Sequence, residues 1–311
     1  MKKRVLLTGA SGFVGANLAR RLLGDGHELH LLLRPAYKRR RVEELQRHVH
    51  MHEADLEDGE GLTGLVSAIR PEWIFHLAVH GAYAHQSDAA RIMRANMLGT
   101  VHLLEACLRT GFDGFVNTGS SSEYGFKDHA PDEQEQLDPN SVYGVSKAAC
   151  TMYCRHTATI HKLHIPTLRL YSVYGAWEEP TRLVPTLLRH ALRGEWPPLA
   201  SPDSAHDFVH VDDVVDAFVL AAATPGQPPG AVYNVGSGVQ TTLAQLVEIV
   251  KGMLPISAEP LWRSMPGRIW DANTWVAGIR RIQETLNWHP RTGLRAGLAR
   301  TLEWMRERGE T

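Results

Sequence analysis

Two side chains suited to proton transfer stand four residues apart near the middle of the chain. Tyr143 and Lys147 would lie on one face of a helix, because side chains at i and i+4 are neighbours there. The phenol of a tyrosine, with an ordinary pKa of about 10, is a poor base at neutral pH, but a nearby ammonium favours its ionised form. Positioned proton transfer typically accelerates a reaction about 10²–10⁴-fold. The pair therefore predicts a site that moves a proton to or from a bound molecule.

A glycine-rich turn near the N-terminus predicts a phosphate site. The segment 8–15 follows an apolar run of strand length and precedes a segment of helical period. Glycines permit a tight turn and close backbone approach, so that amides at the start of the helix can face a pyrophosphate. The pattern indicates a dinucleotide, with a purely structural turn as the alternative. The expected contacts are Gly9, Ser11, Gly12, Phe13, Val14 and Gly15.

The residue after the expected second strand bears on the choice of dinucleotide. NAD sites usually place Asp or Glu there against the ribose hydroxyl, whereas this chain has Arg34. Guanidinium groups match phosphate oxygens, so Arg34 and the basic run 38–41 favour NADP, with NAD as the alternative. A solvated basic helix would also explain the run. Asp55, after a third strand, is expected to accept from the adenine amino group or to cap a helix.

Strand-length apolar runs alternate with helical periods through the first half of the chain. The expected strands are 5–8, 29–33, 73–77, 114–117 and 167–170. The polar stretch 117–125 follows the fifth strand, at the end of a sheet where catalytic groups are presented. Such alternation predicts an α/β fold, a Rossmann-type doubly wound parallel sheet with a smaller C-terminal substrate-binding lobe.

The alternation of strand and helix patterns changes after about residue 174, where prolines interrupt short segments. Strands at 208–211 and 232–235 are expected to return to the sheet, and helices over 276–286 and 294–306 to form a C-terminal cap. We therefore expect a dinucleotide-binding domain over 1–174 with a returning segment at 207–247. The substrate-binding lobe would comprise 175–206 and 248–311.

Composition argues for a small-molecule partner. Lys plus Arg number 33 against 34 Asp plus Glu, so no overall field favours nucleic acid or an anionic membrane. The N-terminal apolar run is too short for a signal peptide or membrane helix, a cytoplasmic pattern. The three cysteines are interpreted as thiols in the cores of helices. The 17 histidines form no His-Glu-x-x-His motif, and there is no Cys-x-x-Cys, so no metal is predicted.

Together these motifs resemble the extended short-chain dehydrogenase/reductases that act on nucleotide-linked sugars, the NAD-dependent epimerase/dehydratase group. The resemblance runs over nearly the entire chain. It is carried by Ser120, by the Tyr143/Lys147 pair, and by the segments 8–15, 75–78, 96–100, 168–175 and 207–213.

The resemblance implies a role for each matching residue. Tyr143 would be the acid/base, Lys147 would hold the nicotinamide ribose, and Ser120 would bind the substrate oxygen that gains or loses hydride. Such a hydroxyl adds a hydrogen bond to a developing alkoxide. Further cofactor contacts are expected from Leu56, Leu77, Ala78, Asn96, Thr118, Tyr171 and Val173.

The resemblance is less specific for one reaction. Dehydratases of dTDP-glucose carry an acidic pair after the catalytic residue, where this chain has Ser121 and Ser122; Glu123 would substitute only in a loop one residue shorter. Segment 119–125 looks most like reductases of NDP-4-keto-6-deoxysugars. With Arg34, it favours an NADPH-dependent ketoreductase. The alternatives are a nucleotide-sugar epimerase, a 4,6-dehydratase and, remotely, a non-catalytic NADP-sensing protein.

The second lobe supplies candidates for the sugar nucleotide. Arg182 and Arg268 would pair with diphosphate oxygens, although either would also fit as a surface charge. His206 stands where the family often has Arg. The full set of expected substrate contacts is Ser121, Ser122, Glu123, Arg182, His206 and Arg268. The resemblance also implies a homodimer built on helices near 96–109 and 143–161.

Overall fold

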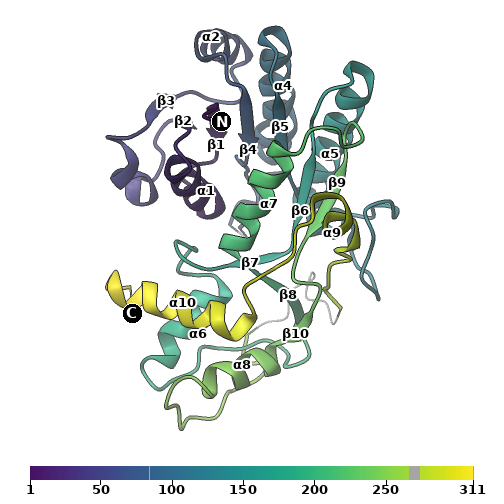
Figure 1. Cartoon of the computed structure of the whole chain (residues 1–311). Coiled ribbons are helices and arrows are strands. Elements are labelled where there is room, and N and C mark those ends of the chain that lie inside the picture. Colours follow the sequence, from purple (N-terminus) through teal and green to yellow (C-terminus); the bar gives the residue numbers. More distant parts are fainter. Residues whose placement is uncertain (84, 266–273, 311) are drawn as a thin grey trace.

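The computed structural model describes residues 1–83, 85–265 and 274–310, and within them the main element is a seven-stranded parallel sheet (Figure 1). Its strand order is β3-β2-β1-β4-β5-β6-β9. The order reverses direction between β1 and β4, and ligands of such sheets bind in the crevice at that point. The strands are β1 (Arg4–Thr8), β2 (Glu28–Leu33), β3 (His50–Glu53), β4 (Trp73–His76), β5 (Gly114–Ser120), β6 (Thr167–Leu170) and β9 (Val232–Val235).

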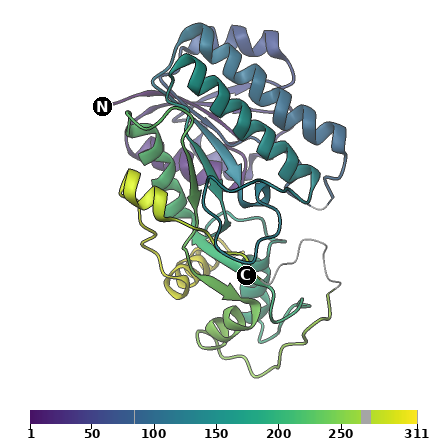
Figure 2. The same ribbon diagram turned by 90° about the vertical axis from the view of Figure 1, so that its right-hand side faces the viewer.

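Helices cover both faces of this sheet, as expected for a doubly wound fold (Figure 2). On one face α1 (Phe13–Gly24) and α7 (Val211–Ala223) pack over the odd-numbered apolar residues of β1 and β2. On the other face lie α2 (Gly59–Ile69), α4 (Gly99–Thr110) and α5 (Val142–His161). Burial on both faces explains why β1 is almost continuously apolar. The predicted α/β fold is confirmed.

Smaller helical elements complete this half of the chain. A long helical stretch is formed by α3 (Ala89–Met93), a π-helical turn η3 (Arg94–Leu98) and then α4. Short 3₁₀ turns are η1 (Arg39–Arg41), η2 (Glu43–Leu45) and η4 (Ser121–Glu123). The turn η4 follows β5 directly, at the end of the sheet where the proton-transfer residues are expected.

A second sheet corrects one prediction about the topology. In the described part of the chain, β7 (Ser172–Tyr174), β8 (Ala205–His210) and β10 (Gln240–Thr242) form a sheet in the order β10-β8-β7. The strand expected at 208–211 is therefore not part of the main sheet. The physical reason is that β9 already occupies the edge beside β6, whereas β7 leaves that sheet and pairs with β8.

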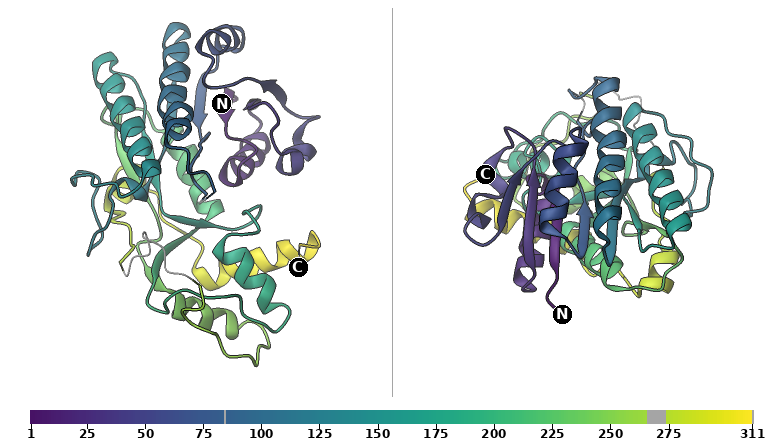
Figure 3. Two further views of the ribbon diagram at one scale, coloured as in Figure 1. Left: turned by 180° about the vertical axis from the view of Figure 1, so that it is seen from behind. Right: turned by 90° about the horizontal axis from the view of Figure 1, so that it is seen from above.

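The second hydrophobic cluster lies where the smaller lobe was expected. It joins α6 (Leu183–Ala191), α8 (Leu243–Lys251) and α10 (Leu294–Glu307), which lie together when the molecule is viewed from behind (Figure 3). The helix α9 (Arg280–Leu286) instead packs on the main cluster and begins later than the predicted residue 276. The segment 207–247 thus divides between the two clusters. No helix in the described ranges is long and apolar enough to cross a membrane.

Candidate functional site

The glycine-rich turn leaves no room for side chains at two of its positions. Gly9 has φ of +75°, and a Cβ added there would lie 2.5 Å from the backbone carbon of Leu77, after β4. A Cβ on Gly15 would lie 2.3 Å from the carbonyl oxygen of Gly9. Gly12 closes the turn by donating from its amide to Gly9 O at 2.9 Å. The loop is therefore packed backbone against backbone, at the crevice between β1 and β4.

The first turn of α1 offers amides to an anion. Its N-cap is Gly12, and no side chain among the described residues caps it. The amides of Phe13 and Val14 precede the first intrahelical hydrogen bonds, and the helix dipole makes this end positive. A pyrophosphate fits both features. The cradle formed by Gly9 and Gly15 and this open helix end therefore fit a dinucleotide.

The basic residues near the end of β2 separate into two groups. Arg34 is exposed directly after the strand. Arg40 pairs with Glu310, and Arg41 is buried with its Nη2 atom 3.1 Å from Glu179. Arg41 therefore connects η1 to the segment around Glu179. Lys38 and Arg39 are exposed, as Arg34 is, but Arg34 directly follows β2 and is the better placed group for a nucleotide phosphate.

Asp55, after β3, was expected either to contact the adenine or to cap a helix, and it does not cap one. Asp58, not Asp55, is the N-cap of α2. Asp55 is exposed, and its Oδ1 accepts from the amide of Glu57 at 3.0 Å. Leu56 packs against Gly99, where an added Cβ would lie 2.9 Å from the Cβ of Leu56. The helix-cap alternative for Asp55 is thus excluded.

Ser120 is held by a reciprocal capping box at the start of η4. Its amide donates to Glu123 Oε1 at 2.8 Å, and its Oγ accepts from the amide of Ser122 at 3.2 Å. Because Oγ serves there as an acceptor, its hydroxyl proton can be directed to a ligand oxygen. Ser121 is buried and Ser122 is half-buried beside it.

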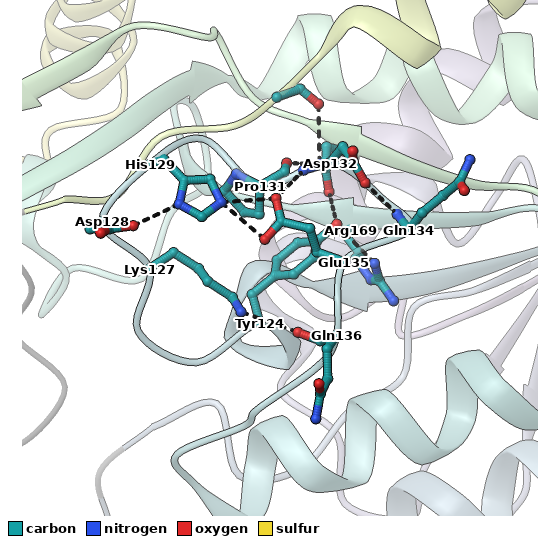
Figure 4. Close-up of polar contacts among 12 residues, drawn as sticks. Tyr124, Lys127, Asp128, His129, Pro131, Asp132, Gln134, Glu135, Gln136 and Arg169 are labelled. Carbon is teal, nitrogen blue, oxygen red and sulfur yellow. Dashed lines mark hydrogen bonds and ion pairs between the residues drawn. The ribbon is translucent and has the colours of Figure 1, made fainter.

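Glu123 lies beneath this loop, bound to a cation from β6. Its Oε2 accepts from Arg169 Nε at 2.8 Å, and the Glu123 side chain is 0% exposed. Arg169 also donates to the Tyr124 hydroxyl at 2.8 Å, and Figure 4 shows both among side chains of the loop that runs to Gln136. Both carboxylate oxygens of Glu123 are engaged and buried. The structure therefore contradicts the expected substrate contact at Glu123.

Tyr143 and Lys147 lie on the first turns of α5, next to η4. The helix is capped by Ser141, whose side chain accepts from the amide of Gly144. A Cβ on Gly144 would lie 2.5 Å from the carbonyl oxygen of Ser122, so the helix start touches the η4 turn. Tyr143 is half-buried, and Lys147 is 4% exposed. The three residues expected to share a pocket thus come from two elements in direct contact.

A buried histidine that sequence reasoning did not single out lies under Lys147. His76, the last residue of β4, has its Nδ1 2.8 Å from Thr8 Oγ1 and its Nε2 3.0 Å from Thr100 Oγ1. Thr100 Oγ1 donates to Asn96 O, so it accepts from His76 Nε2–H, and the Thr8 hydroxyl donates to Nδ1. Burial, together with the nearby Lys147 ammonium, lowers the pKa of His76 to about 3. The imidazole is therefore neutral with an assigned tautomer.

Asn96 positions α5 through its side-chain amide. Its Oδ1 accepts from the His80 amide at 2.7 Å, and its Nδ2 donates to His80 O and to Ser146 Oγ, each at 2.8 Å. Ser146 Oγ in turn donates to Tyr143 O at 2.8 Å. Asn96 is 2% exposed, so its amide is committed inside the protein and not directed at a cofactor. Ser146, inside the Tyr143–Lys147 interval, is the positioning residue that the sequence analysis missed.

The remaining predicted cofactor contacts line the same strand ends. The amide of Ala78 donates to Thr8 Oγ1 at 3.1 Å, and Leu77 is buried beside it. Thr118 Oγ1 is buried and has no hydrogen-bond partner among residues 1–83, 85–265 and 274–310, which suits a ligand contact. Tyr171 lies between β6 and β7, and Val173 lies within β7.

The predicted diphosphate contacts come from different elements of the smaller lobe. Arg182 is exposed at the N-cap of α6, with its guanidinium carbon 5.6 Å from the centroid of the Tyr83 ring. His206 is half-buried on β8, with Nδ1 3.3 Å from Ser172 Oγ. Arg268 lies outside the described residues.

A parallel sheet with an open glycine-rich crevice and a Tyr-x-x-x-Lys helix beside it defines a Rossmann-type protein of the extended short-chain dehydrogenase/reductase class. A family model described as the NAD dependent epimerase/dehydratase family matches residues 5–236. The chain belongs to this family. The resemblance expected from the sequence is confirmed.

Individual relatives match nearly the whole chain. A UDP-glucose 4-epimerase of Mycolicibacterium smegmatis is 32% identical over 99% of this chain and 100% of its own length. The crystal structure of a Thermotoga maritima UDP-glucose 4-epimerase with UDP-glucose is 29% identical, has a TM-score of 0.88, and covers 98% of this chain and 99% of that one. A Thermus thermophilus UDP-glucose 4-epimerase complexed with NAD is 27% identical, with a TM-score of 0.85 and coverage of 97% and 99%.

Proposed function

We propose that this protein is a nucleotide-sugar 4-epimerase that acts on a UDP-hexose and uses bound NAD. The observation that carries the proposal is the contact between η4 and α5, the two elements that hold Ser120, Tyr143 and Lys147, together with the burial of the Glu123 carboxylate in that turn. A 4,6-dehydratase needs an acid beside the hydroxyl residue. Ser121 and Ser122 occupy the positions where dehydratases carry an acidic pair. The Glu123 carboxylate is bound in its ion pair with Arg169.

The chain's own groups suit proton exchange at one sugar oxygen. The nicotinamide ring, when bound, supplies a hydride acceptor and donor at the sugar carbon. Tyr143 removes the proton from the hydroxyl on that carbon and returns it after the sugar has turned its other face. Ser120 donates a hydrogen bond to the same oxygen, where negative charge develops. Lys147 holds the cofactor ribose next to Tyr143. Oxidation and reduction balance within one turnover.

Relatives also support NAD as the dinucleotide, since the Thermus epimerase was solved with it. Arg34 is the observation that favours a second candidate, the NADPH-dependent reduction of an NDP-4-keto-6-deoxysugar. Its exposed guanidinium directly after β2 would suit the additional phosphate of NADP. In both functions Arg182 and His206 serve as contacts for the sugar nucleotide's diphosphate.

A homodimer is part of the proposal. Apolar side chains remain exposed along α5 at helical spacing: Val142, Val145, Met152 and Ile160. An exposed apolar stripe of this kind favours contact with another protein surface. We propose that α5 and α4 pair with the same helices of a second copy.

The deciding experiment measures product and cofactor together. Purified protein is incubated with UDP-glucose or UDP-galactose without added nucleotide, and sugars are quantified by chromatography. The epimerase proposal expects interconversion of the two sugars, no net change in nicotinamide absorbance, and NAD released on denaturation. Stoichiometric loss of NADPH with a panel of NDP-4-keto-6-deoxysugars, and no interconversion, would transfer the assignment to the reductase. Loss of water from an intact NDP-hexose would indicate a dehydratase.

A further inference from the structure

We propose that Glu28, His30 and His50 form a binding site for a divalent transition-metal ion, with Zn²⁺ the best match, at the edge of the main sheet. One potential ligand atom from each of the three lies within 4.8 Å of the others. Two imidazoles and a carboxylate are a ligand set that Zn²⁺ commonly takes. The proposal is independent of the epimerase activity, in which none of these residues takes part.

The pleat of two parallel strands brings the ligands together. Residues two apart on a strand face the same side, so Glu28 and His30 share one face of β2, and His50 and His52 share one face of β3. The register pairs His30 with His50 and Leu32 with His52. β3 is the edge strand of the sheet, beside β2 in Figure 1. Sequence motifs for zinc miss this cluster because its two halves are 20 residues apart and adjacent only through strand pairing.

The separation of the two ligand atoms on β2 matches a tetrahedral ion. His30 Nε2 lies 3.3 Å from Glu28 Oε1. Two ligands bound to Zn²⁺ at about 2.0–2.2 Å in tetrahedral geometry are separated by roughly 3.3–3.6 Å. The His50 ring stacks on His30 with centroids 4.5 Å apart, and His50 is exposed, so its side chain can turn to supply the third ligand. The exposed side leaves a fourth position for water.

A second histidine orients the central ligand. His30 Nδ1 lies 2.9 Å from His52 Nε2. A metal-bound histidine usually donates its other ring N–H to a partner, which fixes its tautomer. With a metal on Nε2, the proton of His30 stays on Nδ1 and is donated to His52. Arg4 is the competing group, because its Nε lies 3.8 Å from Glu28 Oε1, a longer contact than that of His30.

The place of this cluster indicates a structural role. Glu28 and His50 are the first residues of their strands, whereas the candidate catalytic residues lie at the opposite, carboxyl ends. An ion here would fasten β3, a four-residue edge strand, to β2. A ligand that binds only the folded state stabilises it by mass action.

The test is calorimetric titration of the full-length, untagged protein with ZnCl₂. We expect saturable one-to-one binding, weakened by about 10-fold or more in His50→Ala and in Glu28→Gln. His48→Ala is the matched control, because His48 is exposed nearby but lies outside the cluster. Thermal unfolding with excess EDTA should be unchanged in each variant, while the Zn²⁺-dependent rise in unfolding temperature should be lost from His50→Ala and Glu28→Gln.

Cobalt gives a second readout. Co²⁺ bound at the site should show the visible absorption bands of tetrahedral coordination, and Zn²⁺ should displace it. Absence of saturable Zn²⁺ binding would overturn the proposal. Binding that His48→Ala weakens as much as His50→Ala would also overturn it, because it would then arise from scattered surface histidines.

Discussion

Arg169 Nε and Glu123 Oε2 are 2.8 Å apart in an ion pair that is almost completely removed from solvent. The other oxygen of Glu123 accepts from the amide of Ser120. Strand β6 is thereby connected through one carboxylate to the turn that carries the candidate catalytic hydroxyl. The shape of that turn depends on a charge pair in the core.

Breaking this pair should destabilise the fold strongly. Glu123→Gln leaves the Arg169 charge buried without its partner, a change that typically costs about 3–5 kcal/mol. Urea unfolding measures the loss. The double variant Glu123→Gln/Arg169→Met removes both charges and should be more stable than the sum of the single changes implies. Glu284→Gln, in the exposed pair with Arg280, is the control and should unfold like the wild type.

Tyr143→Phe should abolish turnover while nucleotide binding persists, because the ring remains and the transferable proton is lost. The expected fall in kcat is about 10²–10⁴-fold. Tyr153→Phe, on the same helix with its hydroxyl bonded to Glu105, provides the matched control. A normal rate in Tyr143→Phe would mean that another group transfers the proton.

Arg34→Asp tests the contact with a nucleotide phosphate. If Arg34 contacts the extra phosphate of NADP, its loss should weaken NADPH binding by about 10-fold or more. The reason is that hydrogen bonds to charged groups contribute about 1.5–3 kcal/mol. NADH affinity should change little. Fluorescence titrations of protein freed of resident nucleotide measure both, with Arg39→Asp, also exposed, as the control. Equal losses for the two nucleotides would refute the contact.

Glu178 should make stability fall as pH rises. Burial raises the pKa of this carboxyl from 4.5 to about 8, and its Oε2 has no hydrogen-bond partner in the described part of the chain. The folded state therefore holds a proton that the unfolded chain has released above about pH 4.5. Between that pH and 8, the unfolding free energy should decrease by up to about 1.4 kcal/mol per pH unit.

Urea unfolding at several pH values checks the Glu178 prediction. Glu178→Gln keeps the shape without the titration, so its unfolding free energy should lose this slope and exceed that of the wild type at pH 8. Glu195→Gln, at an exposed carboxyl, should retain the wild-type slope. An unchanged slope in Glu178→Gln would contradict the assignment.

Met152→Glu should disrupt the proposed dimer. Met152 is 65% exposed on α5, and a carboxylate there would be buried without a partner in an apolar interface. Light scattering coupled to gel filtration should show a dimer for the wild type and a monomer for this variant. Leu261→Glu is the control, since Leu261 is 72% exposed in the other lobe and should not affect assembly. A monomeric wild type would remove the dimer from the proposal.

Local patterns predicted much of the fold and part of the site. The strands 167–170 and 232–235 occur as expected, and the glycine-rich turn lies at the β1/β4 crevice, because each depends on the period or conformational freedom of its own segment. The partners of side chains depend on distant segments. Glu123 finds Arg169 46 positions away, so its burial was not predicted. Asn96 is committed to Ser146 across two helices for the same reason.

The burial of His76 and the nearby Lys147 charge set the protonation state at the base of the site. Since the His76 imidazole gains a proton only near pH 3, it stays neutral beneath Lys147 in both mildly acidic and alkaline solution. His76 therefore contributes no inflection to a pH–rate curve near neutrality. His76 thus lies within a site proposed to transfer protons, yet its own protonation state does not change over this pH range.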